Sequence, residues 1–154
     1  MTNQVDFGLW YDFRNPKPWQ IDFEVFYQER LDQIVAAEGM GFDSVWLTEH
    51  HFCDDGYTPS PLMIHAAIGA RTKHMKLGTN LMLLPIADPV RIAEDAATLS
   101  LMTGGRFDLG VGIGYRVPQI VYELTSLHAA AVSAECHDLA VLGHNCMQSN
   151  KRPV

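Results

Sequence analysis

Three side chains able to accept or release protons stand together after an apolar segment: Glu49, His50 and His51. The preceding residues 45–47 are valine, tryptophan and leucine, a pattern typical of a parallel strand that is buried on both faces. In sheets built from β-α units, ligands bind where the carboxyl ends of the strands meet. We therefore expect a site for acid–base chemistry at the end of this strand.

The two histidines have more than one interpretation. Successive side chains of an extended strand point to opposite faces, so His50 and His51 do not easily share one metal ion. The helical spacing of zinc-binding His-Glu-x-x-His motifs is absent here, and no metal is expected. His50 is either an acid–base group or a buried imidazole hydrogen-bonded to Glu49 or to a backbone carbonyl. The residue types alone leave both readings open.

A second unusual pattern is the alternation of glycine at positions 110, 112 and 114. It differs from the Gly-x-Gly-x-x-Gly sequence of dinucleotide-binding folds. Alternating glycines leave one face of a strand without side chains, and two structures can use such a face. Either a helix packs closely against it, or a flat ligand ring meets the backbone.

Four expected strands alternate with three expected helices before residue 116. The strands cover residues 5–11, 41–47, 75–84 (interrupted at 78–80) and 106–114, and the helices start near residues 22, 60 and 88. We expect Ser60 to cap the second helix. The residues expected to face inward on the second helix are Leu62, Met63, Ala66, Ala67 and Ala70. Those expected to face inward on the third are Val90, Ala93, Ala97 and Leu101. The order implies a parallel sheet, either open or part of a (β/α)₈ barrel. A complete barrel takes about 250 residues, so this chain supplies about half of one.

Composition narrows the class of protein. The chain has 154 residues, of which 47% are hydrophobic and 19% charged, as in a globular domain. Its formal charge of −7 disfavours a nucleic-acid partner, which normally needs a basic surface. No apolar run is long enough to span a bilayer and no signal peptide is visible, so we expect no membrane association and a cytoplasmic location. Three cysteines without regular spacing indicate reduced thiols.

Several short motifs follow one another in a characteristic order. They are GFDSVWLTEHHF (41–52), KLGT (76–79), LP (84–85), DPVR (88–91), AED (93–95), GGRF (104–107), GVG (110–112) and GYR (114–116). Together they resemble the N-terminal half of the bacterial luciferase-like, flavin-dependent monooxygenase family. The resemblance covers roughly residues 5–116 and implies about half of a TIM-type barrel.

The resemblance also implies a chemistry. Reduced FMN, supplied by a separate flavin reductase or NAD(P)H system, would react with O₂ to give a flavin hydroperoxide that oxygenates a small organic substrate such as an aldehyde. His50 would act in proton transfer or in stabilising the peroxide, with Glu49 as its neighbour. Asn80 and Leu81 lie where family members often carry a non-prolyl cis peptide beside the flavin ring. Gly112 and Ile113 would lie along the flavin.

Residues 117–154 depart from the family pattern, and we expect two parts: a luciferase-like partial barrel at 1–116 and an atypical tail at 117–154. The tail contains one weakly helical stretch, and its Cys136, His137, His144 and Cys146 match no paired zinc-ligand spacing. Truncation or a shifted reading frame near Arg116 would explain the change.

Because the loops that often hold a phosphate in TIM-type barrels follow strands seven and eight, we expect residues 1–154 alone to bind FMN weakly or not at all and to show little monooxygenase activity. The alternative function is a non-catalytic half-barrel, acting as a flavin-holding module, a homo-oligomer or a subunit completed by another half-barrel.

Overall fold

The structure, a computed structural model, describes residues 5–114, so the predictions for the tail lie outside the described residues. Four parallel strands form a sheet in the order β1-β2-β3-β5, and two more form a short parallel pair, β4-β6. The strands are β1 (Gly8–Tyr11), β2 (Ser44–Leu47), β3 (Lys76–Thr79), β4 (Met82–Leu83), β5 (Phe107–Asp108) and β6 (Val111–Gly112). The predicted parallel α/β architecture is confirmed.

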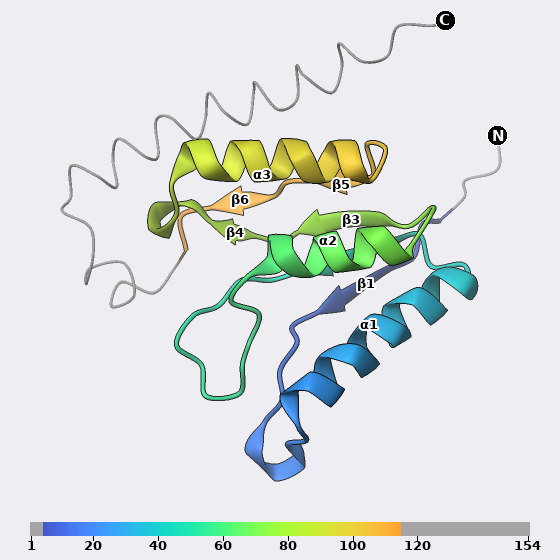
Figure 1. Ribbon diagram of the computed structural model, residues 1–154, viewed down its shortest axis with the longest axis vertical. Helices are drawn as coiled ribbons and strands as arrows, with labels where there is room; N and C mark the ends of the chain where they lie inside the picture. The colour runs from blue at the N-terminus through green and yellow to red at the C-terminus, as the bar shows by residue number, and fades with distance from the viewer. Residues whose placement is uncertain (1–4, 115–154) are drawn as a thin grey trace, which may run out of the picture.

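Three helices connect the strands: α1 (Phe23–Gly39), α2 (Pro61–Arg71) and α3 (Pro89–Met102), with short 3₁₀ turns at Lys17–Trp19 and Leu84–Ile86. Figure 1 shows α1 beside β1, α2 along β3, and α3 beside β5 and β6. The strand arrows of β1, β3, β4 and β6 point to the side from which the loop after β2 projects. Loops that follow different strands therefore meet at one end of the sheet.

Capping residues define where two of the helices begin. The Asp22 carboxylate accepts hydrogen bonds from the amides of Glu24 and Val25, and the Asp88 carboxylate accepts one from the amide of Arg91. Pro61 and Pro89 occupy the first helical position, where proline loses no hydrogen bond. The expected side-chain cap by Ser60 is wrong, because its side chain makes no capping hydrogen bond.

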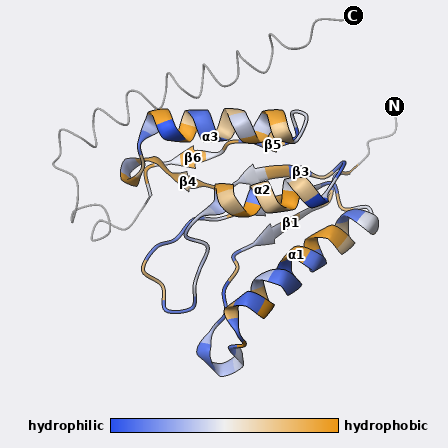
Figure 2. Ribbon diagram, viewed as in Figure 1, coloured by the Kyte–Doolittle hydropathy of each residue, from blue (hydrophilic) through white to orange (hydrophobic). Residues whose placement is uncertain are grey.

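The inward faces predicted for α2 and α3 are right only in part: Leu62 and Ala66 pack against the core, but several other predicted residues do not. Helix α2 buries Ile64, His65 and Ile68 while Met63 is 75% exposed, and α3 buries Ile92 and Leu99. Of the residues predicted to face inward on α3, Leu101 is 76% exposed and Val90 and Ala97 are exposed as well. Apolar residues recur along both helices, as the orange segments of α2 and α3 in Figure 2 show, so periodicity alone does not select a face. The branched isoleucines bury the larger apolar area.

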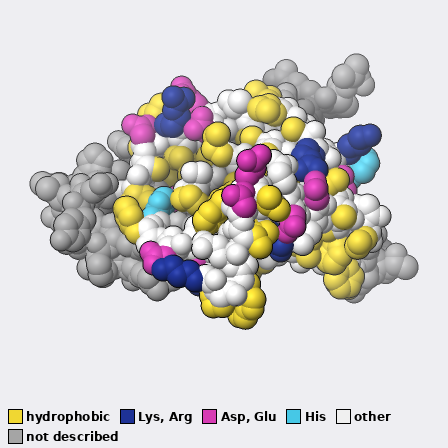
Figure 3. Space-filling view, turned by 60° about the horizontal axis from the view of Figure 1, so that its bottom comes forward, with side chains coloured by type: hydrophobic (Ala, Val, Ile, Leu, Met, Phe, Trp, Pro, Cys, Tyr) yellow, Lys and Arg dark blue, Asp and Glu magenta, His cyan; other side chains and the backbone are white. Residues whose placement is uncertain are grey.

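The core lies between the helices and one face of the sheet. Its fully buried side chains come from both layers: Phe13, Ile34, Val45, Leu47, Ile68, Met75, Leu77 and Phe107. Among the described residues no helix is long and apolar enough to cross a membrane. On the face shown in Figure 3, acidic and basic side chains are interspersed with apolar ones, and the basic side chains form no continuous patch.

The expectation that residues 45–47 are buried on both faces is wrong for this part of the chain. Val45 and Leu47 are completely buried against the helices, but Trp46 on the opposite face is only half-buried. Its indole lies against Gly78, where a side chain would collide with the ring, and its N–H donates to the Ser44 hydroxyl. On the neighbouring strand Trp10 pairs with Trp46 in register and is 64% exposed.

Two predicted strands each divide into two shorter ones. Residues 75–84 form β3 and β4, and residues 106–114 form β5 and β6. At the division, the Thr79 hydroxyl donates to the Gly110 carbonyl (2.8 Å) and accepts from the Gly110 amide (2.9 Å). A Cβ atom at residue 110 would overlap the Thr79 carbonyl oxygen. Glycine at this position therefore serves the close packing of two strand segments, rather than the helix packing that the sequence left open.

Helix α2 carries a buried histidine that sequence reasoning did not single out. The His65 Nε2–H donates to the Gly78 carbonyl (2.9 Å), and its ring packs edge-on against Phe107. The buried Nδ1 has no hydrogen-bond partner among the described residues. Burial lowers the pKa of His65 from 6.5 to about 4, although the hydrogen bond to Gly78 acts in the opposite direction.

This histidine makes stability depend on pH. The unfolded chain binds a proton at His65 at a higher pH than the folded chain does, so its contribution is complete above pH 6.5 and is lost as pH falls toward 4. We expect a loss of about 3 kcal/mol over that window. Urea unfolding at several pH values measures it, and the difference between wild type and His65→Leu isolates this group. Parallel pH curves for the two proteins would contradict the assignment.

Candidate functional site at the carboxyl end of the sheet

The predicted site residues come from four strand ends that backbone hydrogen bonds hold together. The Asn80 amide donates to the Leu47 carbonyl at the end of β2 (2.7 Å), and the Met82 amide donates to the Gly110 carbonyl (2.8 Å). Leu83 of β4 pairs in register with Gly112 of β6. The ends of β2, β3, β4 and β6 therefore form one continuous edge, and all six predicted residues lie on it or directly after it.

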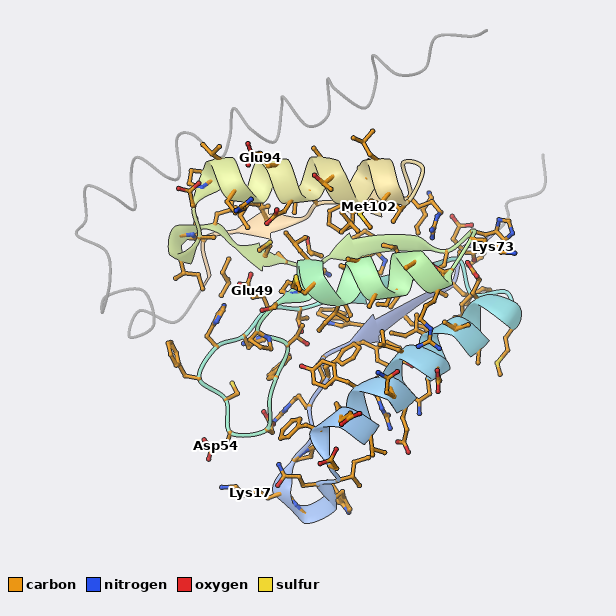
Figure 4. All side chains as sticks on the ribbon, viewed as in Figure 1. Lys17, Glu49, Asp54, Lys73, Glu94 and Met102 are labelled. Atoms are coloured by element: carbon orange, nitrogen blue, oxygen red, sulfur yellow. The ribbon has the colours of Figure 1, made fainter. Side chains whose placement is uncertain are left out.

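Glu49 connects two of these strand ends. The residue is 6% exposed, and its carboxylate accepts a hydrogen bond from the Leu83 amide (2.5 Å) and lies 2.8 Å from the His51 Nε2 atom. Figure 4 shows Glu49 between the loop after β2 and the β4 segment. A buried carboxylate with two partners is well satisfied, so Glu49 fixes the distance between β2 and β4.

The two histidines take different positions. The His51 Nε2 atom lies 2.8 Å from the Glu49 carboxylate. The His50 ring is half-buried and stacks on Tyr57, with centroids 4.0 Å apart and planes inclined by 29°. The His50 amide donates to the Thr58 carbonyl (3.1 Å), which closes the loop between these residues.

The segment expected to lie beside a flavin has the implied backbone. The peptide bond between Asn80 and Leu81 is cis, and both residues are exposed. A Cβ atom on Gly112 would lie 2.7 Å from Leu81 Cδ1, so the Leu81 side chain occupies the space above this glycine. Ile113 follows with 66% of its surface exposed. Leu81 and Ile113 thus present apolar surface at the strand ends, beside the Asn80 amide.

A model of the family described as luciferase-like monooxygenase matches residues 7–131. The chain belongs to the luciferase-like monooxygenase family. The match extends past residue 116, where the sequence motifs end, and the predicted division of the chain there stays a prediction.

Individual relatives agree with this membership. The alkanal monooxygenase alpha chain of Photobacterium phosphoreum is 36% identical over 121 residues, which are 76% of this chain and 34% of the relative. The oxygenase component of the flavin-dependent trigonelline monooxygenase of Acinetobacter baylyi is 31% identical over 57% of this chain and 24% of its own length. The chain spans between 21% and 34% of the length of these curated relatives.

Solved structures confirm the predicted TIM-type fold class. Monooxygenase RslO1 from Streptomyces bottropensis superimposes with a TM-score of 0.76 at 27% identity, covering 88% of this chain and 42% of that one. The oxygenating constituent of 3,6-diketocamphane monooxygenase from Pseudomonas putida, in complex with FMN, gives a TM-score of 0.68 at 25% identity, covering 95% and 39%. The parallel sheet described here corresponds to the strands of a luciferase-like partial barrel.

The described residues fit a flat, partly polar cofactor ring of the kind used in the luciferase-like family. Thr48 lies at the end of β2 and is buried, and its hydroxyl has no hydrogen-bond partner among residues 5–114. Leu81 and Ile113 add exposed apolar surface, and Asn80 adds an exposed amide. A metal fits less well, because the described residues contain no group of three side chains that could hold one.

Sequence reasoning missed three features of this edge. The pairing of His51 with Glu49, the Tyr57 ring on His50 and the unpaired Thr48 hydroxyl all depend on how the loop after β2 returns to the sheet. One signal for Tyr57 was present in the sequence: it is the aromatic residue of the turn-rich segment 53–59, which follows soon after the strand that ends before Glu49.

Proposed function

We propose that this chain supplies the flavin-facing part of an FMN-dependent monooxygenase that oxygenates a small organic substrate, such as an aldehyde. The observation that carries the proposal is the convergence of Glu49, His50, the Asn80–Leu81 segment and Gly112–Ile113 on one edge in a luciferase-like chain. The alkanal and trigonelline monooxygenases named above, and the FMN complex of the diketocamphane enzyme, support the same class of chemistry.

Each residue has a role in this proposal. Reduced FMN, when bound, supplies the electrons that activate O₂. The His50 imidazole holds or moves a proton at the flavin-facing edge, since its ring lies at the end of β2 and its amide is fixed by Thr58. Glu49 holds His51 and β4 in place. Leu81 and Ile113 provide the surface against which the ring lies, and Gly112 leaves room for the Leu81 side chain.

The partners follow from the chemistry. A monooxygenase that uses reduced FMN needs a source of it, so the proposal includes a separate flavin reductase or NAD(P)H system. The trigonelline relative is described as an oxygenase component, which supports such a division of labour.

Incorporation of labelled oxygen tests the proposal. The chain is mixed with FMN, NADH, a flavin reductase and a panel of aldehydes under ¹⁸O₂, and products are analysed by mass spectrometry. We expect one ¹⁸O atom in the oxygenated product, above the level of a reaction without the chain. The same product yield with and without the chain, across the panel, would contradict the proposal.

A second candidate is a subunit that another half-barrel completes. It is favoured by the exposed Trp10, which stands beside Trp46 on the sheet face opposite the helices. In a closed barrel that face is filled by side chains from all strands. Analytical ultracentrifugation tests this candidate: association that is lost in Trp10→Ser supports it, and a monomer at high concentration contradicts it.

A further inference from the structure

Hydrogen bonds connect the end of the loop after β2 to Asp12, the residue that directly follows β1. The Thr58 amide and hydroxyl both donate to the Asp12 carbonyl, at 3.1 and 2.6 Å, and the Thr58 carbonyl accepts from the His50 amide at 3.1 Å. Thr58 is completely buried. The backbone contacts of Thr58 therefore place His50 and Tyr57 near each other independently of the contact between their rings.

A second set of contacts holds Tyr57 from the side of the segment after β1. The Arg14 guanidinium lies over the Tyr57 ring, 5.2 Å from its centroid, and donates to the Asp55 carboxylate at 2.6 Å. That carboxylate also accepts from the Tyr57 amide (3.4 Å), and the Asp55 carbonyl accepts from the Asn15 amide (2.8 Å). Partial burial acts to raise the pKa of Asp55, but the hydrogen bond and charge of Arg14 outweigh it and lower that pKa.

These contacts form a series from Asp55 through Arg14 and Tyr57 to His50. We infer that Tyr57 is a positioning residue, whose ring holds the His50 imidazole in one orientation at the flavin-facing edge. Stacked rings with centroids 4.0 Å apart restrict rotation of the imidazole, and the cation over the tyrosine ring restricts the tyrosine in turn. The inference rests on the proposed function of His50 and adds to it the residue that determines where the imidazole points.

Nuclear magnetic resonance of the unliganded chain tests the positioning directly. Histidine ring resonances are recorded in wild type, Tyr57→Leu and Tyr57→Phe, and His50 is assigned by its loss in His50→Gln. We expect the His50 ring protons to carry an upfield ring-current shift in wild type, to lose it in Tyr57→Leu, and to recover it in Tyr57→Phe. Phe52→Leu is the matched control, because Phe52 belongs to the same loop but is 92% exposed and contacts His51 instead.

Two further measurements separate positioning from folding and from the proposed function. Urea midpoints identify any variant that fails to fold. If Tyr57→Leu does not fold, Arg14→Met replaces it, because this substitution removes the cation over the tyrosine ring and leaves the backbone contacts of Thr58 intact. In the labelled-oxygen assay, kcat should fall about tenfold to a hundredfold in Tyr57→Leu and return in Tyr57→Phe.

The resonance measurement is made without flavin and does not depend on activity. A chain without oxygenase activity would therefore contradict the proposed function, and the ring-current result would still decide the role of Tyr57. His50 resonances that stay in place in folded Tyr57→Leu, or that move equally in Phe52→Leu, would overturn the inference.

Discussion

Replacing Arg106 by methionine should lower the free energy of unfolding by about 3–5 kcal/mol. The guanidinium donates five hydrogen bonds, to the carbonyls of Gly69, Thr72, Thr103 and Met75 and to the Thr72 hydroxyl, over distances of 2.8–3.1 Å. These acceptors lie at the carboxyl ends of α2 and α3 and just before β3. Methionine fills the space but leaves the carbonyls without donors, and unpaired buried acceptors are costly.

Urea denaturation measures the loss, and two variants bracket it. Arg106→Lys should recover only part, because an ammonium group cannot reproduce the planar fork of donors. Arg91→Met is the matched control: its guanidinium is exposed and 3.9 Å from Glu94 and Asp95, so we expect a change within about 0.5 kcal/mol. Equal midpoints for Arg106→Met and Arg91→Met would contradict the role of Arg106.

In a full-length or complemented form of the protein, the largest effect on activity is expected for His50→Ala. A positioned acid–base group contributes about 10²- to 10⁴-fold to a rate, and we expect oxygenation to fall within that range while the urea midpoint changes little. The small change in stability follows from the position of His50, which is half-buried at the end of β2 and held by its backbone amide. The labelled-oxygen assay and urea denaturation measure the two quantities.

His74→Ala provides the control for His50→Ala. His74 is exposed and lies before β3, at the opposite end of the sheet, next to Lys73, whose position Figure 4 shows. Its substitution should leave the oxygenation rate unchanged. A rate that falls equally in both variants, or that falls in neither, would refute the role of His50 as an acid–base group.

The fold could be predicted from local sequence signals whose expected structures are present. Asp22, Asp88 and the two helix-initiating prolines mark helix starts, and the β-α alternation predicts the parallel sheet. The inward faces of α2 and α3 could be predicted only in part. Apolar residues surround both helices, and only the packing against the sheet decides that Ile64 and Ile92 are buried while Met63 and Val90 are exposed.

The location of the candidate site was predictable, but its contacts were not. Strand-end placement brought Glu49 and His50 to one edge with Leu81 and Gly112, as sequence order and the family resemblance imply. Which histidine meets Glu49 depends on the path of the loop after β2. That path is determined by the long-range hydrogen bond from Thr58 to Asp12, which no local pattern encodes.

Titration of the ¹⁵N-labelled chain with FMN tests the central claim most directly. The claim is that the ends of β2, β4 and β6 form the face that receives the flavin ring. We predict weak binding, because the loops that often hold the phosphate in TIM-type barrels follow strands seven and eight. The amide shifts should be confined to His50, His51 and the segments 80–83 and 111–113, and amides near Glu38 and Lys73 at the opposite end should not move. Shifts centred on that opposite end, or spread evenly over the chain, would contradict the account.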